Sequence, residues 1–118
     1  MRFESSNRLG IRLSTADTVL GGVALPAGTR ITLCIGAANR DPAVFAEPDR
    51  LDISRQPKRH LAFGFGAHQC VGMSLARLEG VVAIGRFLPR PGYALAGPAQ
   101  RGGRARLRGF LRVPLRAL

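Results

Sequence analysis

Alternating apolar and polar positions predict short strands in the first third of the chain. From Thr29 to Ile35 every second residue is apolar, which places Ile31, Leu33 and Ile35 on one face of a strand. Cys34 falls on the opposite face, where we expect it to be a small, half-buried apolar residue without a functional role. This segment is the clearest strand that the pattern predicts.

A hairpin is predicted just before this strand. Ile11 to Leu20 alternates enough to form one strand, and Gly21-Gly22 permits the positive φ angles of a tight turn. Val23 to Leu25 is the predicted return strand, and Pro26-Ala27-Gly28 is a second turn. We also expect Met1 to Glu4 to be the end of a helix.

A helical period replaces the strand pattern in the second half. The residues that share one face of a helix from Val71 to Leu88 are Val71, Leu75, Leu78, Val82 and Gly85. Pro89 and Pro91-Gly92 end this helix. Before it, Pro42 to Phe45 forms one helical turn and 57–69 is a loop rich in glycine and aromatic residues. After it, 93–95 is expected to pair with 107–113 as a final hairpin. The pattern predicts an α+β chain.

Length and composition narrow the class of protein. The 118 residues suffice for one modest domain, and the apolar content of 46% is that of a globular protein. No run of about 18 apolar residues is present, so we expect no membrane span. Met1 to Arg12 is polar and has no signal-peptide pattern. We therefore expect a cytoplasmic protein.

Positive charge is concentrated in the second half of the chain. Residues 1–52 hold six Arg and six acids, whereas residues 53–118 hold twelve Lys or Arg against the single acid Glu79. Such a basic half favours an anionic partner. One alternative function is therefore a module whose Arg101 to Arg116 tract binds nucleic acid or an acidic protein. Nucleic acid is the weaker option, because Phe110 is the only aromatic residue there for base stacking.

The segment Phe63-Gly-Phe-Gly-Ala-His-Gln-Cys-Val-Gly72 is the candidate site. Three glycines surround Cys70, so the backbone can approach something flat or bulky. Cys70 stands at the start of the predicted helix, where the helix dipole and free N–H groups stabilise a thiolate. A thiolate in that position is either a nucleophile or a metal ligand.

Two of the usual roles of a thiolate fit poorly. A nucleophile needs a base and an orienting partner; His68 is near, but no Asn or Asp is placed to complete a triad. A zinc site needs four ligands, and Cys34, Cys70, His60 and His68 have no common zinc spacing. An axial haem thiolate needs only one cysteine, and a flat porphyrin explains the glycines.

The same segment resembles the cysteine loop of the cytochrome P450 family, the haem-thiolate monooxygenases. That family carries Phe-Gly-x-Gly-x-His-x-Cys-x-Gly, and every fixed position is matched here. Further stretches also resemble the family: 21–29, 37–42, 45–52 and 74–79. The resemblance implies that 1–118 is the C-terminal part of the mainly α cytochrome P450 fold, with small hairpins, a ligand loop at 63–72, a helix at about 71–88 and a final hairpin.

The resemblance also implies roles for single residues. Cys70 is then the iron ligand of a haem b, Phe63 packs near the thiolate, and Gly64 and Gly66 form the turn under the porphyrin. His68 and Arg12 reach haem propionates. The residues expected to touch the porphyrin from the helix side are Val71, Gly72 and Ala76. His60 is expected to lie on the surface without a role.

The implied activity needs more than this chain. In the family, O₂ and two electrons from a redox partner insert one oxygen atom into a small organic substrate. An acidic ferredoxin-type donor suits the basic half, with Arg59 and Arg77 steering it. Arg2 resembles the arginine of the family's Glu-x-x-Arg pair, whose glutamate would precede Met1, so we expect Arg2 to lack its ionic partner. We expect the isolated chain to be a truncated, inactive fragment.

Overall fold

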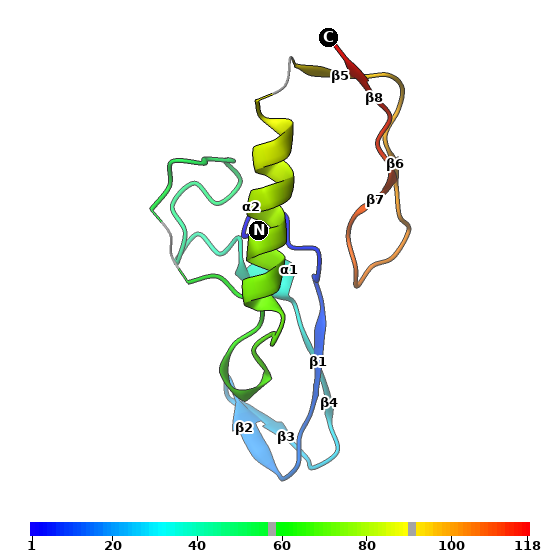
Figure 1. Cartoon of the computed structure of the whole chain (residues 1–118). Coiled ribbons are helices and arrows are strands. Elements are labelled where there is room, and N and C mark those ends of the chain that lie inside the picture. Colours follow the sequence, from blue (N-terminus) through cyan, green and yellow to red (C-terminus); the bar gives the residue numbers. More distant parts are fainter. Residues whose placement is uncertain (57–58, 90–91) are drawn as a thin grey trace. The chain divides into compact units, whose positions relative to one another are not determined.

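The computed structural model describes residues 1–56, 59–89 and 92–118. The predicted start of the loop at Pro57 and the helix stop at Pro91 lie outside these residues. The chain forms two compact units, residues 1–62 with 105–107 and residues 63–104 with 108–118. Figure 1 labels the helices and strands of both units.

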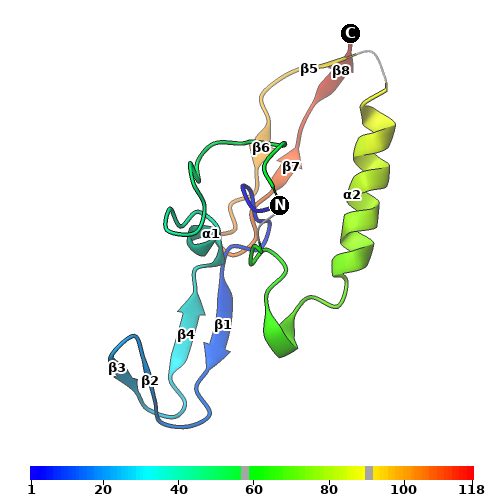
Figure 2. The same ribbon diagram turned by 90° about the vertical axis from the view of Figure 1, so that its left-hand side faces the viewer.

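Unit 1 holds two small antiparallel sheets and one short helix. β1 (Gly10–Leu13) pairs with β4 (Arg30–Leu33), with Gly10 opposite Leu33 and Leu13 opposite Arg30. β2 (Thr18–Leu20) pairs with β3 (Val23–Leu25), and Figure 2 shows this hairpin beyond the end of the β1–β4 ribbon. Gly21 and Gly22 join β2 to β3 with φ of 57° and 82°. The predicted hairpin and its glycine turn are therefore confirmed.

The prediction of one strand from Ile11 to Leu20 is wrong, because the chain changes partners at Ser14. The Ser14 hydroxyl donates to Pro26 O at 2.6 Å and accepts from the Thr29 N–H at 2.9 Å. Asp17 Oδ1 then accepts the Ala27 N–H at 2.8 Å. These side-chain bonds replace the strand ladder between β1 and β2 and fix the second turn, where Gly28 has φ of 81°.

The predicted strand from Thr29 to Ile35 also ends early. β4 stops at Leu33, and Ile35 begins the four-residue helix α1 (Ile35–Ala38). Ile35 turns inward and is buried together with Phe45; these are the buried apolar side chains among the described residues. Cys34, expected to be half-buried, is exposed. Burial of Ile35 therefore outweighs continuation of the alternating pattern. The predicted turn at 42–45 is present, with the Phe45 N–H bonded to Asp41 O at 2.8 Å.

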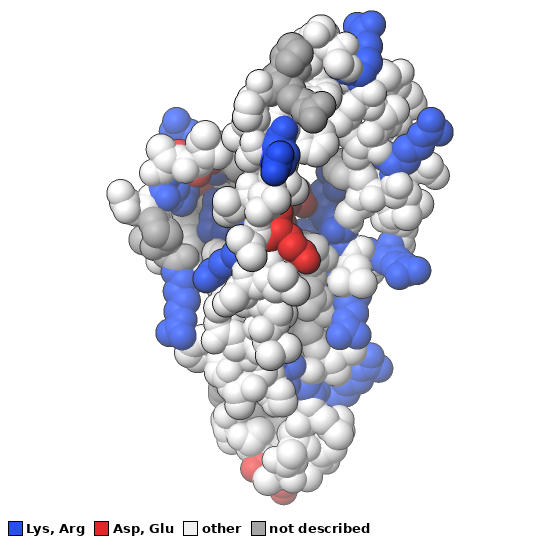
Figure 3. All heavy atoms as spheres, in the orientation of Figure 1, with Lys and Arg blue, Asp and Glu red and all other residues white. Residues whose placement is uncertain are grey.

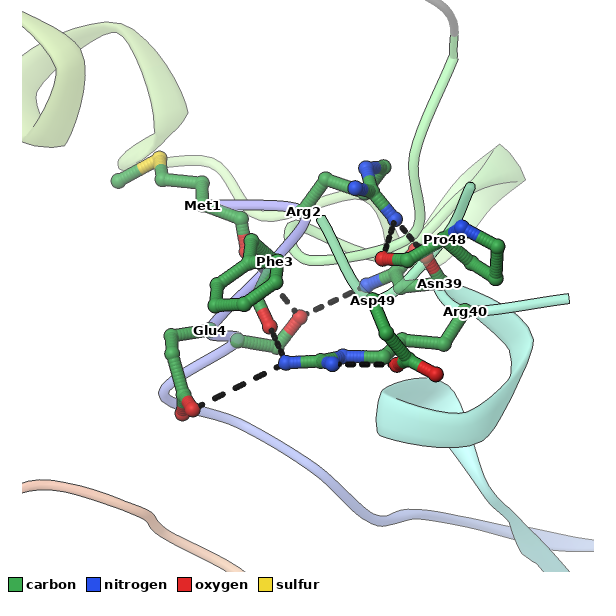
Figure 4. A network of polar contacts seen from close by, with 9 residues as sticks. Met1, Arg2, Phe3, Glu4, Asn39, Arg40, Pro48 and Asp49 are labelled. Atoms are coloured by element: carbon green, nitrogen blue, oxygen red, sulfur yellow. Dashed lines mark hydrogen bonds and ion pairs between the residues drawn. The ribbon is translucent and has the colours of Figure 1, made fainter. Parts of the chain in front are cut away.

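The N-terminal residues form a polar network, and the helix end expected at Met1 to Glu4 is absent. Arg2 Nη1 donates to Asn39 O at 2.8 Å and to Pro48 O at 3.0 Å (Figure 4). Its guanidinium also lies 5.0 Å from the centre of the Phe45 ring. Burial, followed by the charges of Arg55 and Arg40, lowers the pKa of Arg2. These tertiary contacts hold the Arg2 guanidinium, and the charge of Asp49 acts on its pKa in the opposite direction, raising it.

Arg40 supplies the second half of this network. Its guanidinium pairs with Asp49 at 2.6 Å and donates to Phe3 O at 2.7 Å, while lying 4.0 Å from the centre of the Phe3 ring (Figure 4). Glu4 is a more distant ionic partner at 3.9 Å. Residues 1–4 are therefore held by contacts of Arg2 and Arg40, and not by the hydrogen bonds of a helix.

Unit 2 contains the cysteine loop, the long helix and the last four strands. The loop includes a 3₁₀ turn, η1 (Gly66–His68), and leads into α2 (Met73–Phe87). The long helix predicted from Val71 is confirmed but starts two residues later, with Gly72 as its N-cap. The predicted final hairpin has the wrong partners: β5 (Tyr93–Leu95) pairs with β8 (Leu115–Ala117), and β6 (Gln100–Arg101) pairs with β7 (Phe110–Arg112).

Apolar side chains of α2 are exposed throughout its length. No residue of α2 is buried, and the exposed fractions of Leu75 and Leu78 are both 60%. The predicted apolar face therefore exists in sequence but is not covered by the described residues.

None of the described helices is long and apolar enough to cross a membrane. Figure 3 shows the excess of arginine over acidic side chains on one face of the molecule.

Candidate functional site

The cysteine loop is closed by two backbone hydrogen bonds. The Cys70 N–H donates to Phe63 O at 2.8 Å, which joins the first residue of the motif to its cysteine. Inside this ring, the Gln69 N–H donates to Gly66 O at 3.0 Å and closes the 3₁₀ turn. The segment that the sequence singled out is therefore one compact loop, not an extended connection.

Gly64 and Gly66 both have the left-handed backbone that favours glycine. Their φ angles are 72° and 71°. A Cβ on Gly64 would lie 3.2 Å from His68 O, so a side chain there would press on the loop backbone. A Cβ on Gly66 would meet no atom within 4 Å, so there is room for a side chain at this position. Glycine is favoured there because of the left-handed backbone conformation.

Cys70 lies just before α2 and presents its thiol to solvent. The Met73 N–H donates to Cys70 O at 3.2 Å, and the Ala76 N–H donates to Gly72 O at 2.9 Å. Cys70 is thus two residues before the N-cap, a correction to its expected place at the helix start. The thiol is free and exposed, and a Cβ on Gly72 would lie 3.9 Å from its Sγ. The thiol can therefore be reached by a large group.

Phe63 is half-buried, and an arginine of α2 lies over its ring. The guanidinium carbon of Arg77 is 5.7 Å from the ring centroid. The Phe63 carbonyl also accepts the Cys70 N–H. Phe63 therefore contacts α2 through its ring and Cys70 through its backbone. Sequence reasoning placed Arg77 only on the outer surface. The available signal was its position one helical turn after Met73, beside the loop.

The other expected site residues are less constrained. His68 ends the 3₁₀ turn and is exposed, Val71 is fully exposed at 103%, and Ala76 is half-buried on α2. His60, expected to be a surface residue without a role, is half-buried, and its Nδ1 accepts the Ala62 N–H at 3.2 Å. It therefore supports the backbone before the loop.

Arg12 belongs to unit 1 and not to the unit that contains the loop. It lies on β1 opposite Ile31, and its exposed guanidinium donates to the carbonyl of Ile11 at 2.9 Å. Its predicted contact with a propionate remains a prediction.

Asn39 is a structural residue that the sequence analysis did not single out. Its side chain is completely buried, its Nδ2 donates to Ser5 Oγ at 2.7 Å, and its Oδ1 accepts the Leu61 N–H at 2.7 Å. Asn39 thereby fixes the backbone two residues before Phe63. Its only sequence signal was an amide next to a charged pair, which is common in surface turns.

The donor atoms of the site favour a single axial thiolate. Among the described residues, no three His, Cys, Asp or Glu side chains gather where they could hold a metal ion. One exposed thiol on a glycine-framed loop suits an iron that already has other ligands, as in haem. A Cβ on Gly66 would meet no atom within 4 Å, so no described residue blocks a bound group at that point of the loop.

Comparison with known proteins agrees with this geometry. The family model described as cytochrome P450 matches residues 1–90. The biotin biosynthesis cytochrome P450 of Bacillus subtilis is 46% identical over 90 residues, which cover 76% of this chain and 23% of that protein. The vitamin D(3) 25-hydroxylase of Pseudonocardia autotrophica is 49% identical over 98 residues, covering 81% and 24%.

Solved structures give the same result. The hydroxylase HmtN of himastatin biosynthesis matches with a TM-score of 0.93 and 37% identity over 100% of this chain and 33% of that one. P450BioI, solved with an acyl carrier protein ligated to hexadec-9Z-enoic acid, matches with a TM-score of 0.91 and 39% identity, over 97% and 30%. The chain belongs to the cytochrome P450 family, whose members named here include hydroxylases. It spans about a quarter of the length of the curated relatives.

Proposed function

We propose that this chain is the C-terminal haem-binding segment of a cytochrome P450 monooxygenase and that Cys70 is the axial ligand of the haem iron. The observation that carries the proposal is the loop closed by the hydrogen bond from the Cys70 N–H to Phe63 O, which contains two left-handed glycines and one exposed cysteine. The family match supports the haem as the group that this loop holds.

The residues present fit a haem b. The Cys70 thiolate is the single sulfur ligand, and the glycine at position 66 places no side chain in the way of the ring. When bound, the haem supplies the oxygen activation by which one atom of O₂ enters an organic substrate. The chain's own contribution is to hold the thiolate and to orient the ring.

In a full-length protein, Phe63 packs near the thiolate and limits the access of water to it; in this chain its carbonyl accepts the Cys70 N–H and its side chain is half-buried. His68 and Arg12 pair with the two propionates, and charge-assisted hydrogen bonds of this kind fix orientation. The neighbours of the ring on the side of α2 are Val71, Gly72 and Ala76. Substitutions that remove these contacts but leave the loop intact should therefore lower the affinity for haem.

The whole protein's substrate is a small organic molecule. The named relatives act in biotin biosynthesis and on vitamin D(3), so family membership alone does not specify which molecule it is. Because the chain spans about a quarter of such relatives, most of the substrate pocket belongs to other parts of a full-length protein.

The electron donor is proposed to be an acidic, ferredoxin-type protein. Residues 53–118 carry twelve basic residues against one acid, and both Arg59, in unit 1, and Arg77, in unit 2, are exposed. Electrostatic association slows as salt rises, because the Debye length falls from about 10 Å at 0.1 M to about 3 Å at 1 M. Stopped-flow association with a ferredoxin should slow with salt and with charge reversal at Arg59 and Arg77.

Duplex DNA is the matched comparison for that experiment, with variants in the tract from Arg101 to Arg116. A steep salt dependence for DNA together with a flat one for the ferredoxin would contradict the donor and favour a nucleic-acid module.

The test of the haem proposal is the spectrum of the reduced carbon monoxide complex. The chain reconstituted with haem should give a thiolate-type spectrum, which Cys70→Ala and Cys70→His abolish. Cys34→Ala is the matched control, since Cys34 is also exposed but lies in unit 1. A thiolate-type spectrum that persists in Cys70→Ala would refute the assignment.

A further inference from the structure

Arg77 is an exposed residue of α2, and its guanidinium lies over an aromatic ring of the cysteine loop. The guanidinium carbon is 5.7 Å from the centroid of Phe63, within the roughly 6 Å over which a cation is attracted to a ring face. The contact joins the first half of α2 to the first residue of the loop, and both belong to unit 2.

Phe63 is also bonded to the cysteine through its backbone. Its carbonyl accepts the Cys70 N–H at 2.8 Å, and Gly64, which follows it, is already in a left-handed conformation with φ of 72°. The loop therefore has little local preference for one geometry, because a glycine at this point permits several. A fixed Phe63 ring removes part of that freedom and so keeps the Cys70 hydrogen bond formed.

We propose that Arg77 is a positioning residue: its positive charge holds the Phe63 ring and, through it, the loop that presents Cys70. The ordering of the loop is a property of the chain itself, whereas its benefit to an iron ligand rests on the haem-binding function proposed above. Arg77 does not touch the thiol.

Charge and bulk can be separated by two substitutions. Arg77→Met keeps a long unbranched side chain over the ring but removes the charge, and Arg77→Lys keeps the charge. Arg86→Met removes a charge from the last turn of the same helix, away from the loop in sequence. A role based only on packing would leave the methionine variant close to the parent.

Amide hydrogen exchange of the haem-free chain, followed by NMR, tests the proposal without the cofactor. Exposed cation–π contacts contribute enough to change a local opening equilibrium by about two- to fivefold. We expect the Cys70 amide to exchange faster by that factor in Arg77→Met, and to stay near the parent rate in Arg77→Lys and Arg86→Met. Equal rates in Arg77→Met and the parent, or no protection of the parent amide, would overturn the proposal.

A second measurement applies to the haem-loaded chain. A positive charge favours the reduced iron more strongly the closer it lies, so Arg77→Met, which removes the charge beside the Phe63 ring of the loop, should lower the reduction potential more than Arg86→Met does. An equal effect of both variants would contradict a specific influence of Arg77. If haem binding itself fails, the exchange experiment still decides the role of Arg77, so the two failures are distinguishable.

Discussion

Asn39 shows how a single residue can organise unit 1. It is completely buried, and its side chain and backbone bind Ser5, Leu61, Arg2 and Ile35. Few apolar side chains are buried in this unit, so polar contacts carry an unusual share of its organisation. A buried amide that satisfies several partners is costly to replace, because each partner then loses a hydrogen bond away from water.

Replacement of Asn39 should therefore destabilise unit 1. Asn39→Leu leaves the Ser5 hydroxyl and the Leu61 N–H without their present partner, and an unsatisfied buried group costs about 1–3 kcal/mol. We expect a lower urea midpoint of unfolding, while Ser6→Ala, at an exposed neighbour of Ser5, should have little effect. An unchanged midpoint for Asn39→Leu would show that water reaches these groups.

The proposed propionate contacts give a second prediction about single residues. His68→Leu should weaken haem binding by about 1.5–3 kcal/mol, the value of one hydrogen bond to a charged group. Arg12→Leu should act in the same direction. Arg30→Leu is the control, since Arg30 lies on the neighbouring strand β4. The measurement is the haem dissociation constant, and values equal to the parent for both variants would refute the propionate roles.

At the scale of elements, the cysteine loop depends on glycines whose conformation other residues rarely adopt. Gly64→Ala combines a left-handed backbone with a Cβ 3.2 Å from His68 O, so it should destabilise the loop. Gly80→Ala is the matched control. Gly80 lies within α2, and a Cβ there would meet no atom within 4 Å, so the alanine should stabilise the helix by up to about 1 kcal/mol. Circular dichroism melting and Cys70 amide exchange together measure both effects. Equal protection of Cys70 in Gly64→Ala and the parent would contradict this account.

Local signals predicted the elements that local chemistry determines. The Gly21-Gly22 turn requires positive φ, and the helical period from residue 71 onward is long, so both were correct within two residues. The break at Ser14 was missed because it depends on bonds to Pro26 and Thr29, more than ten residues away. The partner of β5 was missed for the same reason: Leu115–Ala117 and the expected 107–113 are both plausible strands, and the pairing is decided by distant chain geometry.

The loop was predicted more completely than its surroundings. Its glycines and cysteine are specified by their own chemistry, whereas Asn39 and the contact of Arg77 with Phe63 depend on residues brought together by folding. A lone amide or arginine carries no signal of such contacts in the sequence.

At the scale of the whole molecule, the chain has the local structure of a larger fold with little core of its own. Nearly all of it matches solved cytochromes P450, but it covers only 30% and 33% of two of them. No described residue of unit 2 is buried, and the apolar residues of α2 face solvent. Water would therefore reach any group bound at the loop.

Exposure to water leads to a prediction about activity. Productive oxygen chemistry needs a site that excludes water and holds the substrate. We expect the purified 118-residue chain, loaded with haem and supplied with electrons, to form no substrate-derived product while it reduces O₂ without coupling. Mass spectrometry of the products, with the full-length Bacillus subtilis relative as the positive control, makes the comparison. Substrate-dependent hydroxylation by the chain would contradict the prediction.

The bond between iron and the sulfur of Cys70 is the central claim, and X-ray absorption at the iron edge of the haem-loaded chain detects it most directly. We predict a sulfur atom among the nearest neighbours of iron in the parent and in Cys34→Ala. The same sulfur should be missing in Cys70→Ala. Sulfur retained at the iron in Cys70→Ala, or no sulfur in the parent, would contradict the account.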